Sequence, residues 1–164
     1  MTMKVGIVTT LAALILFPAW AQSDQSDLFP SRTWALDGFG FYGSRDKDGG
    51  SDGAWGPGVG ASYFFTENWG AGADTYADAW NIPYLLNASA IFKYPLRESR
   101  FAPYGFAGFG RQWDHGAQWM AHLGGGVEYS IRSDISAFAD LRGVFPDKTK
   151  DFVVLRFGIR FYFR

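Results

Sequence analysis

Residues 152–164 have the sequence FVVLRFGIRFYFR, which alternates between two kinds of side chain. One parity is apolar and consists of Val153, Leu155, Phe157, Ile159, Phe161 and Phe163. The other parity carries three arginines, Arg156, Arg160 and Arg164. Because successive side chains of a β-strand point to opposite faces, the segment predicts a strand with one apolar face and one charged face. Lipid on one side and a polar lumen on the other would suit both faces.

The first 21 residues have the layout of a secretory signal peptide. Lys4 is followed by an apolar run of about thirteen residues and by Ala19-Trp20-Ala21, which predicts cleavage after Ala21. An N-terminal membrane anchor is disfavoured because the run is shorter than the roughly 20 residues that cross a bilayer as a helix. We therefore expect a signal peptide over 1–21, a periplasmic leader over 22–32 and a barrel over 33–164.

Composition excludes several other classes of protein. The chain has no cysteine and a formal net charge of -1, so it indicates neither disulfides, thiolate metal sites nor nucleic-acid binding. The segment after residue 21 has no apolar stretch long enough for a transmembrane helix, so a membrane location would require a closed barrel. Aromatic residues at 19% and 21 glycines favour that solution, because aromatics form interfacial girdles and glycines permit strand curvature.

Eight alternating segments divide the chain after the leader. They cover residues 33–42, 54–65, 69–80, 84–94, 102–112, 118–131, 135–145 and 152–164. Each is close to the roughly nine to eleven residues of a tilted spanning strand, and their number is even. The polar, glycine-rich stretch SRDKDGGSDG, 44–53, is predicted as a loop. The sequence thus predicts an all-β fold, an eight-stranded antiparallel up-and-down transmembrane β-barrel.

Parity also predicts which side chains enter the lumen. The charged residues and the histidine assigned inward are Asp37, Asp74, Asp78, Lys93, Arg111, His122, Glu128, Asp140, Arg142, Arg156 and Arg160. Unpaired charges would be costly in a lumen that side chains fill, so we expect a plug of salt bridges. The expected bridges join three arginines, Arg142, Arg156 and Arg160, to carboxylates among Asp140, Glu128 and Asp74 or Asp78, with the individual partners left open. His122 is expected to lie beside Glu128 and Gln118. An inward Asp37 also turns Phe39 and Phe41 inward, so the first strand could slip or bulge.

Three stretches resemble a known family. They are PYGFAGFGRQW at 103–113, AHLGGGVEYSIRSDISAFADLRGVF at 121–145 and LRFGIRFYF at 155–163. These are similar to the C-terminal half of outer-membrane β-barrel proteins of the OmpA transmembrane-domain and OmpX-like superfamily. The resemblance implies a place in the lipid bilayer of the bacterial outer membrane, reached through periplasmic chaperones and the outer-membrane assembly machinery. In that family the machinery recognises an aromatic C-terminal strand, here Phe157, Ile159, Phe161 and Phe163, although Arg164 departs from the usual aromatic ending.

The function is less constrained, because one fold hosts several activities. We expect a monomer with a structural or surface-interaction role, no catalysis and no cofactor. A lipid A-modifying enzyme of the deacylase kind would need a serine two residues after a histidine, and neither His115 nor His122 has one. The acidic loop with Asp46, Asp48 and Asp52 lacks EF-hand spacing, so no metal site is predicted. A narrow pore for small solutes and a soluble lipocalin-type barrel are the remaining alternatives.

Overall fold

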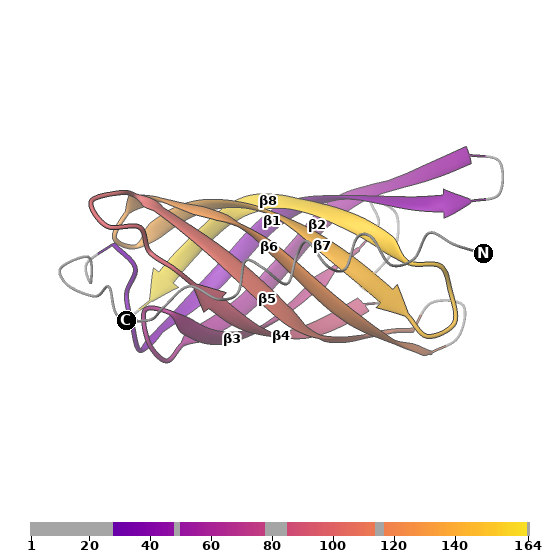
Figure 1. Ribbon diagram of the computed structural model, residues 1–164, viewed down its shortest axis with the longest axis horizontal. Coiled ribbons are helices and arrows are strands. Elements are labelled where there is room, and N and C mark those ends of the chain that lie inside the picture. Colours follow the sequence, from indigo (N-terminus) through magenta and orange to yellow (C-terminus); the bar gives the residue numbers. More distant parts are fainter. Residues whose placement is uncertain (1–27, 48–49, 78–84, 114–116, 164) are drawn as a thin grey trace.

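Eight strands form a closed antiparallel barrel. The computed structural model describes residues 28–47, 50–77, 85–113 and 117–163, with the backbone alone for 44–47 and 50–52. The strands are β1 (Thr33–Lys47), β2 (Gly50–Phe64), β3 (Trp69–Tyr76), β4 (Leu85–Lys93), β5 (Phe101–Gln112), β6 (Gln118–Arg132), β7 (Ile135–Pro146) and β8 (Phe152–Phe163). Each strand pairs with the next, and β8 closes the barrel against β1 (Figure 1). The predicted fold class is confirmed.

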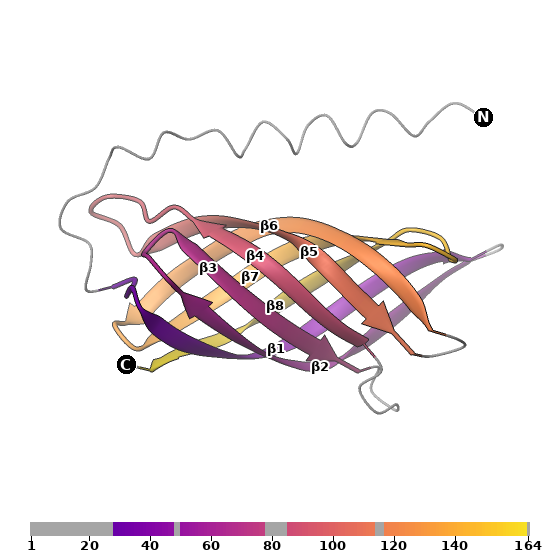
Figure 2. The ribbon, with the colours of Figure 1, turned by 90° about the horizontal axis from the view of Figure 1, so that it is seen from below.

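The strands are strongly tilted to the long axis of the barrel (Figures 1 and 2). The end that holds Thr33, Phe163 and the turns after β2, β4 and β6 is called the terminal end below. The opposite end, at the connections after β1, β3, β5 and β7, is called the loop end. The described residues include no helix that is long and apolar enough to span a membrane.

The first strand keeps one register on both sides. It pairs with β2 from Thr33↔Phe64 to Lys47↔Gly50, and with β8 from Trp34↔Phe163 to Arg45↔Phe152. Among the described ladders, a register shift occurs between β6 and β7, at Ser130 and Arg132. The slip considered for the first strand is therefore not found.

The largest differences from the expected strand boundaries lie in the β1–β2 hairpin and at the end of β3. The stretch 44–53 was expected to be a loop, but its described backbone extends the β1–β2 hairpin beyond the other strands (Figure 1). Its glycines and charged residues have a low strand propensity and suit a turn. Strand propensity depends on context, however, so backbone pairing can continue from an existing ladder into such residues. β3 ends at Tyr76 rather than at residue 80. The signal peptide at 1–21, leader residues 22–27, and residues 78–84 with Asp78 lie outside the described residues.

The outward face of the barrel is apolar and is bounded by aromatic side chains. At the terminal end these are Trp34, Tyr63, Phe65, Trp69, Phe92, Phe101, Tyr129 and Phe163, and at the loop end they include Trp55, Trp113 and Trp119. Trp119 and Tyr129 are ten residues apart on β6. At about 3.3 Å per residue and a tilt of about 40°, they lie about 25 Å apart along the axis, which is the height of the apolar band of an outer-membrane barrel.

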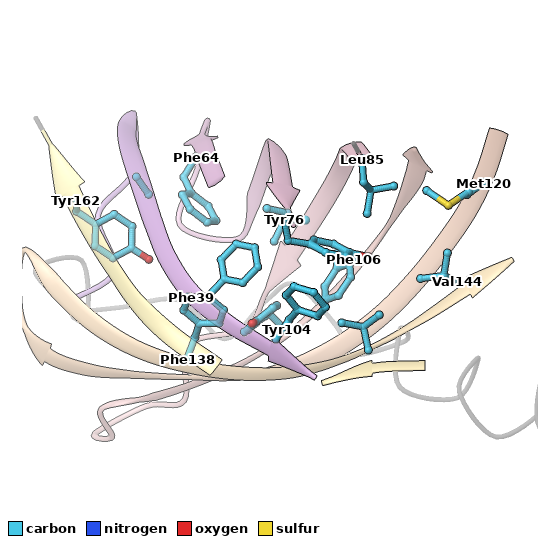
Figure 3. Packing of buried hydrophobic residues seen from close by; sticks show 14 residues of the cluster. Phe39, Phe64, Tyr76, Leu85, Tyr104, Phe106, Met120, Phe138, Val144 and Tyr162 are labelled. Atoms are coloured by element: carbon cyan, nitrogen blue, oxygen red, sulfur yellow. The ribbon is translucent and has the colours of Figure 1, made fainter. Parts of the chain in front are cut away.

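The inward face combines apolar and charged side chains. Its buried apolar cluster includes Phe39, Phe41, Phe64, Tyr76, Leu85, Tyr104, Phe106, Met120, Phe138, Val144 and Tyr162 (Figure 3). The Phe39 ring packs edge-on against Phe138, with 6.3 Å between the ring centroids. Phe39 and Phe41 thus belong inside, on the same parity as Asp37, because other inward rings pack around them.

Candidate functional site in the barrel lumen

Asp74 on β3 is the centre of one group of ion pairs. The Arg142 guanidinium, on β7, donates to both carboxylate oxygens of Asp74, with an Nη1–Oδ1 distance of 2.9 Å. Asn87 Nδ2 donates to the same Oδ1 over 2.9 Å, and Arg156 Nη1 lies 3.2 Å from Oδ2. β3 and β7 are four strands apart in the closed order, so the Arg142–Asp74 pair spans the lumen.

Asp140 on β7 extends this group. Arg156 donates to it through Nε and Nη2, over 2.8 and 2.9 Å. The Tyr104 hydroxyl donates to Asp140 Oδ2 over 2.6 Å. Arg156 therefore bridges two carboxylates, Asp74 and Asp140, and its charge is neutralised from both sides.

Glu128 on β6 is the centre of a second group, and its side chain is fully buried. Arg160 Nη1 donates to Glu128 over 2.7 Å, while its Nε and Nη2 both donate to Asp37 over 2.8 Å. The Tyr162 hydroxyl donates to Glu128 Oε1, and Lys93 Nζ lies 3.3 Å from Oε2. Lys93 also donates to the Tyr162 oxygen over 2.6 Å.

The lumen charges are balanced across the described residues. Four carboxylates, Asp37, Asp74, Glu128 and Asp140, face four cations, Lys93, Arg142, Arg156 and Arg160, and every member has an opposite charge within 3.3 Å. Sequence reasoning placed Tyr162 in the lumen by parity, but it did not identify the Asp37–Arg160 pair, Tyr104 or the carboxylate partner of either tyrosine hydroxyl. Tyr104 shares the inward parity of its strand, and this is the signal that could have identified it.

Aromatic rings separate and cover the arginines. The Arg156 guanidinium carbon lies 5.1 Å from the Phe39 ring centroid and 5.2 Å from that of Phe106. Arg160 lies 5.2 Å from the Phe138 ring. A guanidinium is attracted to the face of an aromatic ring, and this attraction is stronger away from water. The rings therefore fill the space between ion pairs without leaving the charges unsatisfied.

Phe29 closes the lumen at the terminal end. It lies in the predicted leader before β1 and is 0% exposed. Lys93 Nζ lies 4.0 Å from the Phe64 ring centroid, 5.0 Å from Tyr162 and 5.2 Å from Phe29. The described end of the leader thus covers the buried ammonium group instead of extending away from the barrel.

Arg111 does not join the lumen network. On β5 it is paired with Leu86 of β4 and Trp119 of β6, whose side chains face outward, while the inward parity holds Tyr104 and Phe106. The guanidinium carbon of Arg111 lies 5.2 Å from the Trp119 ring centroid. Arg111 was predicted to face inward, but it lies on the parity opposite to Tyr104 and Phe106, and a position at the edge of the apolar band lets the charge reach water.

His122 contacts a different partner from those expected. Its Nε2 lies 2.8 Å from Ser89 Oγ, whereas Gln118 donates to Gln112. Ser89 on β4 and His122 on β6 are both paired with Gly108 of β5, which has no side chain to separate them. A search for a serine on the same strand as the histidine missed this pair, because the contact crosses a strand.

The Ser89–His122 contact has part of the geometry of an activated nucleophile. A catalytic serine also needs the second ring nitrogen of its histidine to be held by a third group. In the described part of the chain, His122 Nδ1 is buried without a hydrogen-bond partner. The described residues also include no group of three or more histidine or carboxylate side chains placed to hold a metal ion.

A small cavity lies between the two charged groups. Its volume is about 20 Å³, and its lining includes Asp37, Asp74, Ser89, Tyr104 and Arg156. A cavity of this size holds about one water molecule. The polar lining could bind that water, but the cavity is too small for an organic solute.

Comparisons with known proteins place this fold in a class. No protein-family model and no curated protein matches the chain. Among solved structures, Neisserial surface protein A has a TM-score of 0.63 and 18% identity, covering 79% of this chain and 97% of that one. The N-terminal β-barrel domain of Pseudomonas aeruginosa OprF has a TM-score of 0.57 and 23% identity, and the match covers 81% of this chain and 98% of that one. Ail, the attachment invasion locus protein of Yersinia pestis, has a TM-score of 0.60 and 14% identity, and the match covers 81% of this chain and 99% of that one.

These proteins are small outer-membrane barrels, and the chain shares their fold. The expected resemblance to eight-stranded barrels of this class is confirmed at the level of the fold. At these identities the likeness defines the architecture, while the role has to be argued from the residues of this chain.

Proposed function

We propose that this protein is an integral protein of the bacterial outer membrane with a structural or surface-interaction role, and that its lumen is a plug. The observation that carries the proposal is the pairing of all eight described lumen charges inside an apolar-faced closed barrel. Bridges such as Arg142–Asp74 cross the lumen, so a solute could pass only if buried ion pairs separated. Separating such pairs costs several kcal/mol, about 3 to 5 when one partner is removed.

The outer-membrane location is supported from two directions. The apolar band of about 25 Å matches the hydrocarbon thickness that these barrels cross. The similar structures are themselves outer-membrane proteins. We include in this proposal a signal peptide over 1–21, a periplasmic leader over 22–32 and a barrel over 33–164.

Insertion by the outer-membrane assembly machinery is part of the same proposal. The four residues of the proposed recognition signal are all exposed on the outward face of β8: Phe157, Ile159, Phe161 and Phe163. Their side chains are therefore accessible along the strand that closes the barrel. We also propose that the barrel works as a monomer, because its wall is closed and β8 pairs with β1.

The surface role rests on the loop end of the barrel. With the terminal end in the periplasm, the connections after β1, β3, β5 and β7 would face outside the cell. The β1–β2 hairpin reaches furthest beyond the strands (Figures 1 and 2), which makes it the main candidate for contact with a partner. One of the similar structures, Ail, is described as an attachment invasion protein.

Three alternatives fit the structure less well. A pore would need a continuous polar path, but ion pairs such as Arg142–Asp74 cross the lumen, and the cavity between the two charged groups holds only about one water molecule. A lipid A-modifying enzyme would need its nucleophile accessible to lipid, whereas His122 is buried and its contact with Ser89 lies inside the barrel. In a soluble lipocalin-type barrel the apolar face would point inward around a ligand. Here the large apolar side chains and the aromatic girdles face outward, which disfavours that class.

Conductance in planar bilayers separates the plug from the pore. We expect the wild-type barrel to give no steady single-channel current. The double variant Phe29→Ala, Arg156→Ala should give openings, because it removes the cover over Lys93 and a guanidinium that bridges two carboxylates. Steady currents from the wild-type protein would overturn the plug, and the variant shows that the assay can detect an opened lumen.

A further inference from the structure

Arg111 differs from the three arginines of the lumen. Arg142, Arg156 and Arg160 point inward and each contacts a carboxylate. Arg111 lies on the outward face near the loop end, and its interactions in the described part of the chain are with the rings of Trp119 and Trp113. It is a cation on a face that is otherwise apolar.

The two tryptophans hold the guanidinium in place. Its central carbon is 5.2 Å from the Trp119 ring centroid and 5.7 Å from that of Trp113. Arg111 Nε is covered and has no hydrogen-bond partner among the described residues. Because contact with a ring does not use the N–H donors of a guanidinium as hydrogen bonds to oxygen do, these donors stay available for an oxygen acceptor.

The depth of Arg111 identifies the acceptor. Arg111 is paired directly with Trp119, which marks the loop-end edge of the apolar band on β6. A membrane changes at this depth from hydrocarbon to headgroups, and the phosphate groups lie there. A guanidinium binds phosphate with two parallel hydrogen bonds, and an arginine side chain can extend from the apolar face towards the headgroups.

Two charged residues of the loop after β7 lie against the start of β6, near Trp119. Lys148 Nζ donates to the Ala117 carbonyl oxygen over 2.8 Å, and Asp147 N donates to the Trp119 carbonyl oxygen over 3.0 Å. The loop after β7 thus brings one lysine and one aspartate against the start of β6, and their charges offset each other. In the described part of the chain, Arg111 itself forms no ion pair with a carboxylate.

We propose that Arg111, held between Trp113 and Trp119, binds the phosphate group of a lipid headgroup in the outer leaflet. The proposal rests on the outer-membrane location under the proposed function. Such a contact would fix the rotation and depth of the barrel next to β5 and β6. It would also favour lipids with a net anionic phosphate around this side of the barrel over zwitterionic lipids, whose phosphate is neutralised by an ammonium group of the same headgroup.

The test measures lipid retention by native mass spectrometry. Folded barrel in detergent micelles is titrated with phosphatidic acid, and separately with phosphatidylcholine. The wild-type protein should prefer phosphatidic acid, and Arg111→Gln should weaken its binding about five-fold, as expected for one basic residue near an anionic surface. The matched control is Arg132→Gln at the terminal end, where Arg132 already donates to both oxygens of Asp134, over 2.7 and 2.6 Å. This control should bind phosphatidic acid as the wild type does.

The outcomes distinguish this inference from the proposed function. Equal binding of phosphatidic acid by the wild type and Arg111→Gln would overturn the Arg111 site while leaving the membrane location intact. Equal losses for Arg111→Gln and Arg132→Gln would also overturn it, because they would indicate an unspecific effect of charge. A protein that enters neither micelles nor bilayers would instead contradict the proposed function. Heat-modifiable gel migration verifies that each variant is folded before the titration.

Discussion

Replacing Glu128 with glutamine should lower the free energy of unfolding by about 3 to 5 kcal/mol. Glutamine keeps the size of the side chain but removes the charge that Lys93 and Arg160 share, and both cations are buried. One full positive charge would then remain uncompensated among the described lumen residues. Urea titration of the barrel in lipid vesicles, followed by gel migration of folded and unfolded forms, measures the change.

Two further variants test whether the loss comes from the buried charge. Asp134→Asn breaks an exposed pair with Arg132 and should have little measurable effect, because water solvates both groups. Adding Lys93→Met to Glu128→Gln should recover part of the stability, since it removes the excess charge. If Glu128→Gln cost no more than Asp134→Asn, the paired lumen would not be the source of stability.

Replacing Gly108 with alanine should have the second large effect. A Cβ atom at this position would lie 1.9 Å from the Ala88 carbonyl oxygen, on the backbone of the neighbouring strand. A rigid strand cannot move aside as a flexible side chain can, so we expect a loss of about 3 kcal/mol or failure to form the barrel. The change would also separate Ser89 from His122, whose contact passes over this glycine.

Gly38→Ala is the matched control for that experiment. A Cβ atom at Gly38 would have no atom within 4 Å among its described neighbours. We expect unchanged or slightly higher stability, by up to about 1 kcal/mol, because alanine restricts the unfolded chain. Folding yield and heat-modifiable migration of the two variants give the comparison. Equal behaviour of Gly108→Ala and Gly38→Ala would contradict the close approach of β4 and β5.

The alternation of side chains made the fold predictable from sequence. Period-two alternation is a local property, and in residues 152–164 it separates six apolar residues from three arginines without knowledge of any other strand. Strand number and closure then follow from counting such segments. The stretch 44–53 escaped this reasoning, because glycine and charge indicate a turn while the backbone of the β1–β2 hairpin continues to pair.

The partners within the lumen were less predictable, for a geometric reason. Contacts such as Arg142–Asp74 join strands on opposite sides of the barrel and depend on the stagger of all the strands between them. Parity assigns a side chain to a face but does not give its height along the axis. Arg111 illustrates a different error: it is an odd number of residues from Tyr104, so along the unbroken β5 its side chain falls on the outward parity and not on the inward one.

The central claim is that the apolar outward face contacts lipid. The most direct measurement combines protease protection of the refolded chain in lipid vesicles with gel migration before and after heating. We expect a protease-resistant core of about the size of residues 33–163, and a faster-migrating folded form that becomes slower after boiling. A stable, fully soluble monomer in buffer without detergent or lipid would contradict the account, because the apolar band would then have to lie inside the protein.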